Sequence, residues 1–156
     1  MIYTEYCFDS LHFHWGKHNG HGSEHTVNGE SFPLEVHLVH YSCDYEQAGE
    51  AITDYATGQA NIKYDDENVL AVIGVIFEIG KPNPVLSKIL DDMIIDGIYQ
   101  KDVSSNPALL QLFYTEFDLK GLLPESREVV GYLGSLTTPP CFEVCFVAYF
   151  VFSGNF

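Results

Sequence analysis

Apolar and polar side chains alternate along residues 2–16, which is the pattern of a β-strand with one buried face. Residues 26–41 predict a hairpin that turns at Asn28-Gly29, a dipeptide favoured in tight strand connections. Residues 69–79 are almost continuously apolar and β-branched, so we expect a central strand that is buried on both faces.

One segment has helical periodicity instead. Asn83-Pro84 begins it, with proline in the first turn, where its missing N–H breaks no helical hydrogen bond. Apolar side chains then recur every three or four residues and predict a helix that packs against the strands. These side chains are Val85, Leu86, Ile89, Leu90, Met93 and Ile94.

The rest of the chain predicts shorter elements. The polar, acidic stretch 42–68 is the expected insertion, with a short helix around residues 45–55. Apolar stretches nearer the C-terminus predict strands at 113–119, 129–133 and 143–152, a turn at 121–124 and a proline-stiffened loop at 135–140. The pattern as a whole predicts one β-dominated α+β domain with one clear helix.

The amino-acid composition is typical of a packed domain, and the net charge argues against certain classes of binding partner. The chain has 156 residues, of which 46% are hydrophobic, including 11 Phe and 10 Tyr. Its net charge of −15 argues against nucleic acid or an anionic membrane surface as a partner, because both require a basic patch. The longest apolar run, 144–152, is too short to span a bilayer. Residue 1 falls within a strand pattern and lacks the features of a signal peptide, so we expect a sequence truncated at both ends.

The four cysteines are Cys7, Cys43, Cys141 and Cys145, and their spacing fits no zinc ribbon. Strand alternation places Cys141 and Cys145 on the same face. The residues alone therefore favour one or two buried thiols over a disulfide among these four.

The histidine pattern carries the strongest chemical signal. His12 and His14 flank Phe13, so in a strand both imidazoles project from one face. Glu35 and His37 share a face of a second strand by the same count. If the two strands are neighbours, three imidazoles converge with a carboxylate close by. Three neutral nitrogen ligands leave one tetrahedral position of a zinc ion open, as in catalytic zinc sites.

The residues around these histidines resemble the α-class carbonic anhydrases. Six stretches occur in the family's order, and the separation of His14 from His37 matches without a gap. The stretches are LHFHWG (11–16), GSEHTV (22–27), LEVHLVHY (34–41), VLAVIG (69–74), GLLPES (121–126) and GSLTTPP (134–140). The resemblance implies a large, twisted, mostly antiparallel sheet with short peripheral helices, and a single domain over 1–156 that lacks its N- and C-terminal parts.

The resemblance also implies a reaction. His12, His14 and His37 would bind Zn²⁺, and zinc-bound hydroxide would attack CO2 to give bicarbonate and a proton. The alternative is a catalytically weak or inactive relative that serves as a zinc-binding or interaction module. An unrelated zinc hydrolase would need a helical H-E-x-x-H motif, which the sequence lacks.

Further roles follow from the same resemblance. Thr137 would accept a hydrogen bond from the hydroxide and pass its own proton to Glu24, although by type alone these are a turn hydroxyl and a loop carboxylate. Glu35 would accept a hydrogen bond from His37 and so fix its tautomer. Ser10 stands where the family has a glutamine that supports the first zinc histidine, so that support is weaker.

The CO2 pocket would have an apolar and a polar side. Val39, Val72 and Leu136 match the apolar wall, and Thr138 would line the polar side. The sequence departs from the family in three other places: Val147 replaces a tryptophan, Cys145 a valine and Leu133 a proline. No residue matches the family's proton-shuttle histidine.

The remaining features are peripheral. His25 resembles a structural histidine packed near the site, His40 should face away from the metal, and His18 and His21 fall in a solvated turn. Cys141 follows two prolines, as in secreted and membrane-anchored members. That resemblance favours an extracellular or membrane-anchored full-length protein and leaves a cytoplasmic one open.

Overall fold

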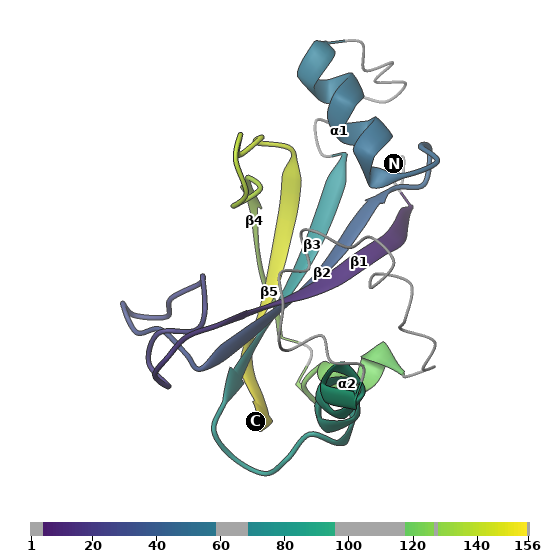
Figure 1. Ribbon diagram of the computed structural model, residues 1–156. Helices are drawn as coiled ribbons and strands as arrows, with labels where there is room; N and C mark the ends of the chain where they lie inside the picture. The colour runs from purple at the N-terminus through teal and green to yellow at the C-terminus, as the bar shows by residue number, and fades with distance from the viewer. Residues whose placement is uncertain (1–4, 59–68, 96–117, 127, 156) are drawn as a thin grey trace.

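The computed structural model describes residues 5–58, 69–95, 118–126 and 128–155. Within these ranges five strands form one twisted sheet in the order β1-β2-β3-β5-β4, with two helices at its periphery (Figure 1). The elements are β1 (Tyr6–Trp15), β2 (Leu34–Ser42), α1 (Ala48–Thr57), β3 (Leu70–Glu78), α2 (Pro84–Ile95), the 3-10 helix η4 (Leu119–Leu122), β4 (Val130–Gly134) and β5 (Cys145–Asn155). The predicted β-dominated, single-domain class is confirmed.

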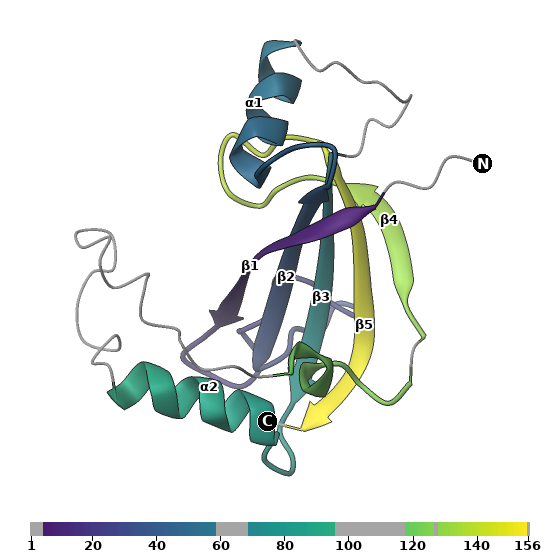
Figure 2. The same ribbon diagram turned by 90° about the vertical axis from the view of Figure 1, so that its right-hand side faces the viewer.

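The sheet is mostly antiparallel, as predicted. β1 and β2, β2 and β3, and β4 and β5 pair antiparallel, whereas β3 and β5 are parallel. A parallel pair needs a crossover connection, and the chain between β3 and β5 includes α2 and η4. The apolar run predicted as a central strand is β3, the middle strand of the five, and Figure 2 shows it between β2 and β5.

One face of the sheet carries the main hydrophobic core. Because side chains alternate along a strand, the residues between the predicted metal ligands point to this face of the sheet. Leu86 and Ile89 of α2 pack there against Val36 and Phe77, and all four side chains are buried. The prediction of a packing helix is therefore confirmed, but Leu90 is 37% exposed, so the buried stripe is narrower than the pattern indicated.

The start of α2 is also as predicted. The Asn83 Oδ1 atom accepts hydrogen bonds from the backbone N–H groups of Val85, at 2.9 Å, and Leu86, at 3.0 Å. These bonds satisfy donors that a helix N-terminus leaves without an intrahelical partner, so Asn83 caps the helix.

A second core cluster closes one end of the sheet. Ala51 of α1 is fully buried there with Leu70, Val144 and Cys145. Figure 1 shows α1 at the end of the sheet opposite α2. The short helix expected in the acidic insertion is thus present, and it covers an end of the sheet rather than a face.

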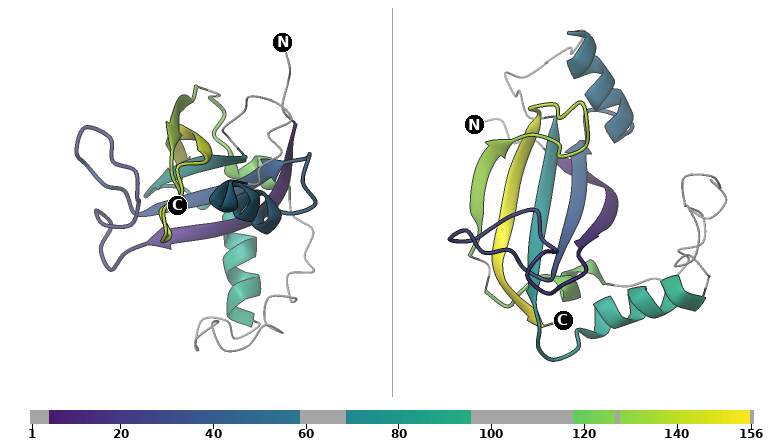
Figure 3. Two further views of the ribbon diagram at one scale, coloured as in Figure 1. Left: turned by 90° about the horizontal axis from the view of Figure 1, so that it is seen from above. Right: turned by 60° about the vertical axis from the view of Figure 1, so that its left-hand side comes forward.

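The hairpin predicted over 26–41 is only partly correct. The turn forms, with positive φ at both Asn28 (54°) and Gly29 (83°). However, the pairing around it is a single bridge between Val27 and Glu30, and the strand begins at Leu34. Residues 16–33 instead form a loop across one face of the sheet, visible in the right-hand view of Figure 3.

Two other expectations need correction. Residues 113–117 of the predicted strand 113–119 lie outside the described residues, and Leu119 begins η4, which also replaces the simple turn expected at 121–124. Cys7 and Cys43 form a disulfide, contrary to the preference for free thiols. Strand pairing brings them together, because Cys7 lies opposite Tyr41, two residues before Cys43.

The other two cysteines are free thiols, Cys141 exposed and Cys145 buried. No helix in the described ranges is long and apolar enough to cross a lipid bilayer.

Candidate metal centre and its hydrogen-bond network

The three histidines of the predicted zinc site converge on the face of the sheet opposite the main hydrophobic core. His12 lies directly opposite His37 in the β1–β2 ladder, and His14 lies opposite Glu35. One ring nitrogen from each histidine lies within 4.8 Å of the others. The strand period of two therefore places all three rings on the same face, as the sequence predicted.

The donor set fits a zinc ion. The His14 Nε2 and His37 Nδ1 atoms are 3.2 Å apart. Tetrahedral zinc with Zn–N bonds of about 2.0–2.1 Å requires ligand nitrogens about 3.3 Å apart. The side chains are thus arranged so that three neutral nitrogens could share one ion and leave a fourth position free.

Glu35 orients the His37 ring. The carboxylate is fully buried, and its Oε1 atom accepts a hydrogen bond from His37 Nε2 at 2.7 Å. Because an ionised carboxylate can only accept, Nε2 carries the proton, and the Nδ1 lone pair is free for a metal. The predicted contact between Glu35 and His37 is present.

Three further donors converge on the same carboxylate. Glu35 Oε2 accepts from the backbone N–H groups of Glu24, at 2.9 Å, and His25, at 2.8 Å, and Oε1 accepts from His25 Nδ1. Burial by itself raises the pKa of Glu35. The hydrogen bonds from His25 and His37 outweigh it and hold the pKa well below its ordinary value. Glu35 is therefore ionised at neutral pH.

The loop that supplies these donors packs tightly against its own last residues, just before β2. The backbone N–H groups of Gly22 and Ser23 both donate to Phe32 O at 2.8 Å. A Cβ atom at Gly22 would lie 1.8 Å from Pro33 O, so only glycine allows this approach. The close packing at Gly22 brings Glu24 within reach of the histidines.

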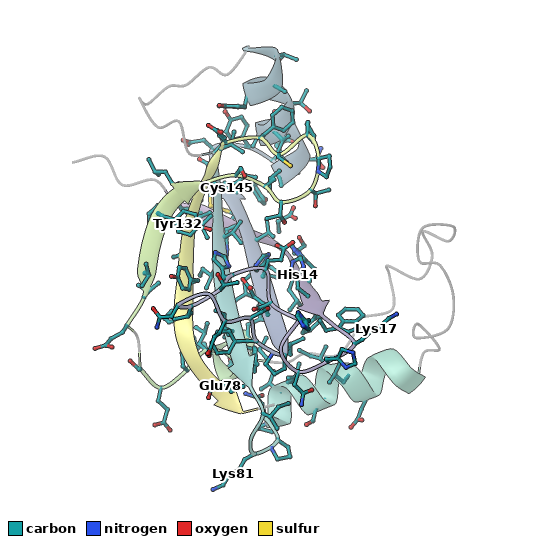
Figure 4. The ribbon with its side chains drawn as sticks, turned by 90° about the vertical axis from the view of Figure 1, so that its left-hand side faces the viewer. His14, Lys17, Glu78, Lys81, Tyr132 and Cys145 are labelled. Carbon is teal, nitrogen blue, oxygen red and sulfur yellow. A yellow bond between two sulfur atoms is a disulfide. The ribbon has the colours of Figure 1, made fainter. Side chains whose placement is uncertain are left out.

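His25 belongs to a wider network that the sequence did not reveal. Its Nδ1 atom donates to Glu35, so in the neutral ring Nε2 accepts, and the Tyr132 hydroxyl donates to it at 2.7 Å. Tyr149 stacks on the same ring with a centroid distance of 4.6 Å. Figure 4 shows Tyr132 and His14 on the same face of the sheet. His25 is thus the structural histidine expected, with two tyrosines that were missed.

No local pattern around either tyrosine pointed to this role. Tyr132 and Tyr149 become neighbours of His25 because β4 and β5 follow β3 in the sheet. Gly74 leaves the required space, since a Cβ atom there would lie 3.1 Å from Glu35 Oε1 and 3.2 Å from Tyr149 Cβ. The order of the strands in the sheet brings these tyrosines to His25, and the alternation within each strand does not indicate it.

Thr137 and Glu24 also meet beside the histidines. The Thr137 hydroxyl donates to Glu24 Oε2 at 2.9 Å. The same oxygen lies 3.5 Å from His14 Nε2 and 4.0 Å from His37 Nδ1. The threonine comes from the loop between β4 and β5, so a contact expected from resemblance alone is present in the structure.

The environment favours the neutral form of His12 and His14. Burial lowers the pKa of His12 and of His14, and the neighbouring His37 ring lowers both further. Neutral imidazoles have the free lone pair that a metal requires.

An apolar row lies next to the histidines. Val39 pairs with Val72, and Val72 with Val147, on the face that carries His37. Leu136 packs against the same cluster, while Thr138 is exposed. The three apolar residues expected to line the CO2 pocket therefore lie together, and Val147 extends their row.

Ser10 does not make the expected contact with His12 in the described residues. Its hydroxyl donates to Asp9 Oδ2 at 2.7 Å. The β1–β2 register shifts between Phe8 and Ser10, and the adjacent carboxylate is a stronger acceptor than an imidazole nitrogen. The first histidine consequently lacks support from this side chain.

The remaining histidines lie where alternation and polarity placed them. His40 is on the opposite face, where its Nδ1 atom lies 3.1 Å from Leu38 O and its ring contacts Phe8 edge-on. His18 and His21 are exposed in the loop. None of these three contributes to the candidate centre.

Comparison with known proteins identifies the family. The family model of eukaryotic-type carbonic anhydrases matches residues 1–156. Carbonic anhydrase 1 of Mus musculus is 40% identical over 139 residues, which cover 88% of this chain and 45% of that protein. Carbonic anhydrase 7 of Mus musculus is 39% identical over 139 residues, with the same coverage. The chain thus spans about half the length of these relatives. It belongs to the eukaryotic-type carbonic anhydrase family.

Proposed function

We propose that this protein is a zinc-dependent carbonic anhydrase that reversibly hydrates CO2 to bicarbonate and a proton. The convergence of His12, His14 and His37, with Glu35 holding the His37 tautomer, is the observation that carries the proposal. Family membership supports it. We further propose that residues 1–156 belong to one carbonic anhydrase domain.

The three imidazoles would hold Zn²⁺ as neutral ligands. Zinc with such ligands lowers the pKa of bound water to about 7, a value known from carbonic anhydrase itself, and so makes hydroxide available at neutral pH. Glu35 keeps the His37 Nδ1 lone pair directed toward His14. The neutral state of His12 and His14 leaves the full charge of the ion to act on solvent.

Thr137 and Glu24 would select and orient what occupies the fourth position. Thr137 gives its hydroxyl hydrogen to Glu24, so its oxygen can only accept from another group. A group at the metal must therefore carry a hydrogen to donate to Thr137. That donation would direct a lone pair of the donor toward the substrate.

The apolar row would bind CO2, which has no net dipole. Val39, Val72 and Leu136 supply an apolar surface to which water binds weakly, so that CO2 can take its place. Val147 extends this surface. Thr138 would line the polar side. An apolar side suits CO2 and a polar side suits bicarbonate, so these two small-molecule substrates would explain why the pocket has both.

A second candidate is a relative that binds zinc with little or no turnover. The bond from Ser10 to Asp9 favours it, because His12 then lacks support from the Ser10 hydroxyl. Metal-supporting partners of this kind typically contribute 10–100-fold in affinity or activity, so a slow enzyme is the milder form of this alternative.

The test is stopped-flow measurement of CO2 hydration on protein of known zinc content. We expect a rate above the buffer rate, its loss after chelation and its recovery on adding Zn²⁺. His37→Ala should abolish zinc binding and activity, whereas His40→Ala, a histidine on the same strand but the opposite face, should retain both. Zinc bound at one per chain without hydration would favour the second candidate. Folded protein that binds no zinc would exclude both.

We infer that the full-length protein resides in an oxidising compartment, extracellular or at the cell surface. The disulfide between Cys7 and Cys43 supports this, because such bonds persist mainly outside the cytosol. Fractionating cells that express the full-length gene would test it, and a purely cytosolic product would contradict it.

A further inference from the structure

Two of the three histidines lie on β1, and the pairing of β1 with β2 places them beside the third. In the described part of the chain β1 is an edge strand that pairs only with β2. No residue of β1 is fully buried, and Leu11 and Phe13 are only partly covered by the core. Within the described residues, the pairing of β1 with β2 is what aligns His12 and His14 with His37.

That register is interrupted near the site. The ladder shifts between Phe8 and Ser10, two residues before His12. Bulges weaken local pairing and bend the strand. A slip of two residues would move His12 by about 7 Å relative to His37, and a slip of one would turn both β1 histidines to the opposite face. Either slip would destroy the three-histidine cluster.

The disulfide lies on the far side of this shift. It joins Cys7, one residue before Phe8, to Cys43, which follows the last residue of β2. The Cys43 N–H group also donates to Glu5 O at 2.9 Å, so the two strand ends are fastened by a covalent and a hydrogen bond. The covalent link permits only registers in which Cys7 stays beside Cys43.

We infer that Cys7 and Cys43 are positioning residues for the metal centre: their disulfide holds β1 in the register on β2 that aligns His12 and His14 with His37. This inference rests on the proposed zinc site. The disulfide lies near the end of the strand pair, where Cys7 is opposite Tyr41, whereas His12 is opposite His37, four residues earlier on β2. Its influence is exerted through the alignment of β1 on β2.

The first measurement counts thiols. Denatured wild-type protein should contain two free thiols, Cys141 and Cys145, and peptide mapping should recover the Cys7–Cys43 link. Four free thiols in protein purified under oxidising conditions would overturn the inference.

The second measurement compares metal binding in the double variant Cys7→Ser/Cys43→Ser with two controls. Cys141→Ser removes an exposed cysteine and keeps the disulfide. Ile89→Ala removes core packing from α2 and keeps the disulfide. We expect the double variant to bind Zn²⁺ at least tenfold more weakly. We also expect weaker visible absorption of bound Co²⁺, because a displaced ligand disturbs tetrahedral geometry. Both controls should retain the wild-type dissociation constant and Co²⁺ spectrum.

Hydrogen exchange tests whether loss of the disulfide loosens the pairing of β1 with β2. Backbone amides of β1 should exchange faster in the double variant, whereas those of β3 should keep their protection. A folded double variant with wild-type zinc affinity, Co²⁺ spectrum and β1 protection would overturn the inference. Equal weakening in Ile89→Ala would also overturn it, because the effect would then be general destabilisation. Absence of zinc binding in wild type and all variants would instead refute the proposed function.

If the double variant does not fold, the wild-type protein provides the same comparison. A dithiol reductant transfers two electrons and two protons to the disulfide, so that the S–S bond breaks, each cysteine gains a hydrogen, and the dithiol closes to a cyclic disulfide. The reductant is then removed under argon before titration with Zn²⁺. Reduced protein that matches oxidised protein in zinc affinity and Co²⁺ spectrum would overturn the inference.

Discussion

Thr137 donates a hydrogen bond of 2.9 Å to Glu24, 113 residues earlier in the chain. The bond joins two loops, one after β1 and one after β4, above the three histidines. Because the threonine hydrogen is used in this bond, the threonine oxygen can only accept a hydrogen bond from another group. The candidate centre would therefore offer a directional hydrogen-bond acceptor in addition to the charge of a bound ion.

Thr137→Val should therefore reduce CO2 hydration while zinc stays bound. The variant keeps the side-chain shape but cannot accept a hydrogen bond, and we expect kcat/KM to fall about 100-fold. Stopped-flow kinetics on protein of measured zinc content checks this. Thr53→Val, on the exposed side of α1, should keep full activity. Unchanged kinetics in Thr137→Val would remove the threonine from the proposed reaction.

Glu35→Gln should weaken both zinc binding and the fold. The glutamine amide would place its own N–H donors against groups that already donate hydrogen bonds to Glu35. Some of these buried N–H groups would therefore lose their acceptor. We expect zinc affinity to fall about 10–100-fold and the free energy of unfolding to fall by about 3 kcal/mol. Chelator competition and urea unfolding measure these effects. Glu30→Gln, an exposed loop change, is the matched control.

The same variant should have an altered pH dependence in metal-free protein. The pKa of Glu35 is lower in the folded state, because hydrogen bonds from His25 and His37 outweigh burial. Its contribution to stability is therefore complete above the ordinary carboxyl pKa and is lost as pH falls through the lowered value. The difference in unfolding free energy between wild type and Glu35→Gln should shrink in acid. A constant difference from neutral to acidic pH would contradict this account.

Tyr132→Phe should loosen the network behind the metal centre. The change removes the hydroxyl that donates to His25 Nε2 and leaves the ring in place. We expect a loss of about 1 kcal/mol in unfolding free energy and a small decrease in zinc affinity. Tyr149→Phe keeps the stacking ring on His25 and should leave zinc affinity unchanged. Equal zinc affinities in wild type and Tyr132→Phe would limit the tyrosine to a role in stability.

Cys145 should make stability fall in alkaline solution. Burial raises the pKa of its thiol from 9.0 to about 11. The thiol therefore loses its proton at a lower pH in the unfolded chain than in the folded protein. Its contribution to stability is complete below the pKa of the unfolded state and is lost as pH rises toward the pKa of the folded state. Relative to Cys145→Val, wild-type protein should lose on the order of 2 kcal/mol over this interval. Urea unfolding at several pH values checks the prediction, and Cys141→Ser should follow the wild-type curve.

Local sequence patterns determined much of this protein. Alternation placed His12 and His14 on one face, because strand geometry depends only on neighbouring residues. The Asn28-Gly29 turn and the Asn83 cap were predictable for the same reason, since each satisfies the backbone within a few residues. Helical periodicity identified α2, although it did not indicate that Leu90 would be exposed.

Tertiary structure decided what those elements meet. The parallel placement of β5 beside β3 brought Tyr149 and Tyr132 to His25, and the register of β1 on β2 brought Cys7 beside Cys43. Resemblance suggested the contact of Thr137 with Glu24, but no spacing within the chain implied it. The physical reason is that a strand's own residues set its period, whereas its neighbours and register depend on burial across the whole sheet.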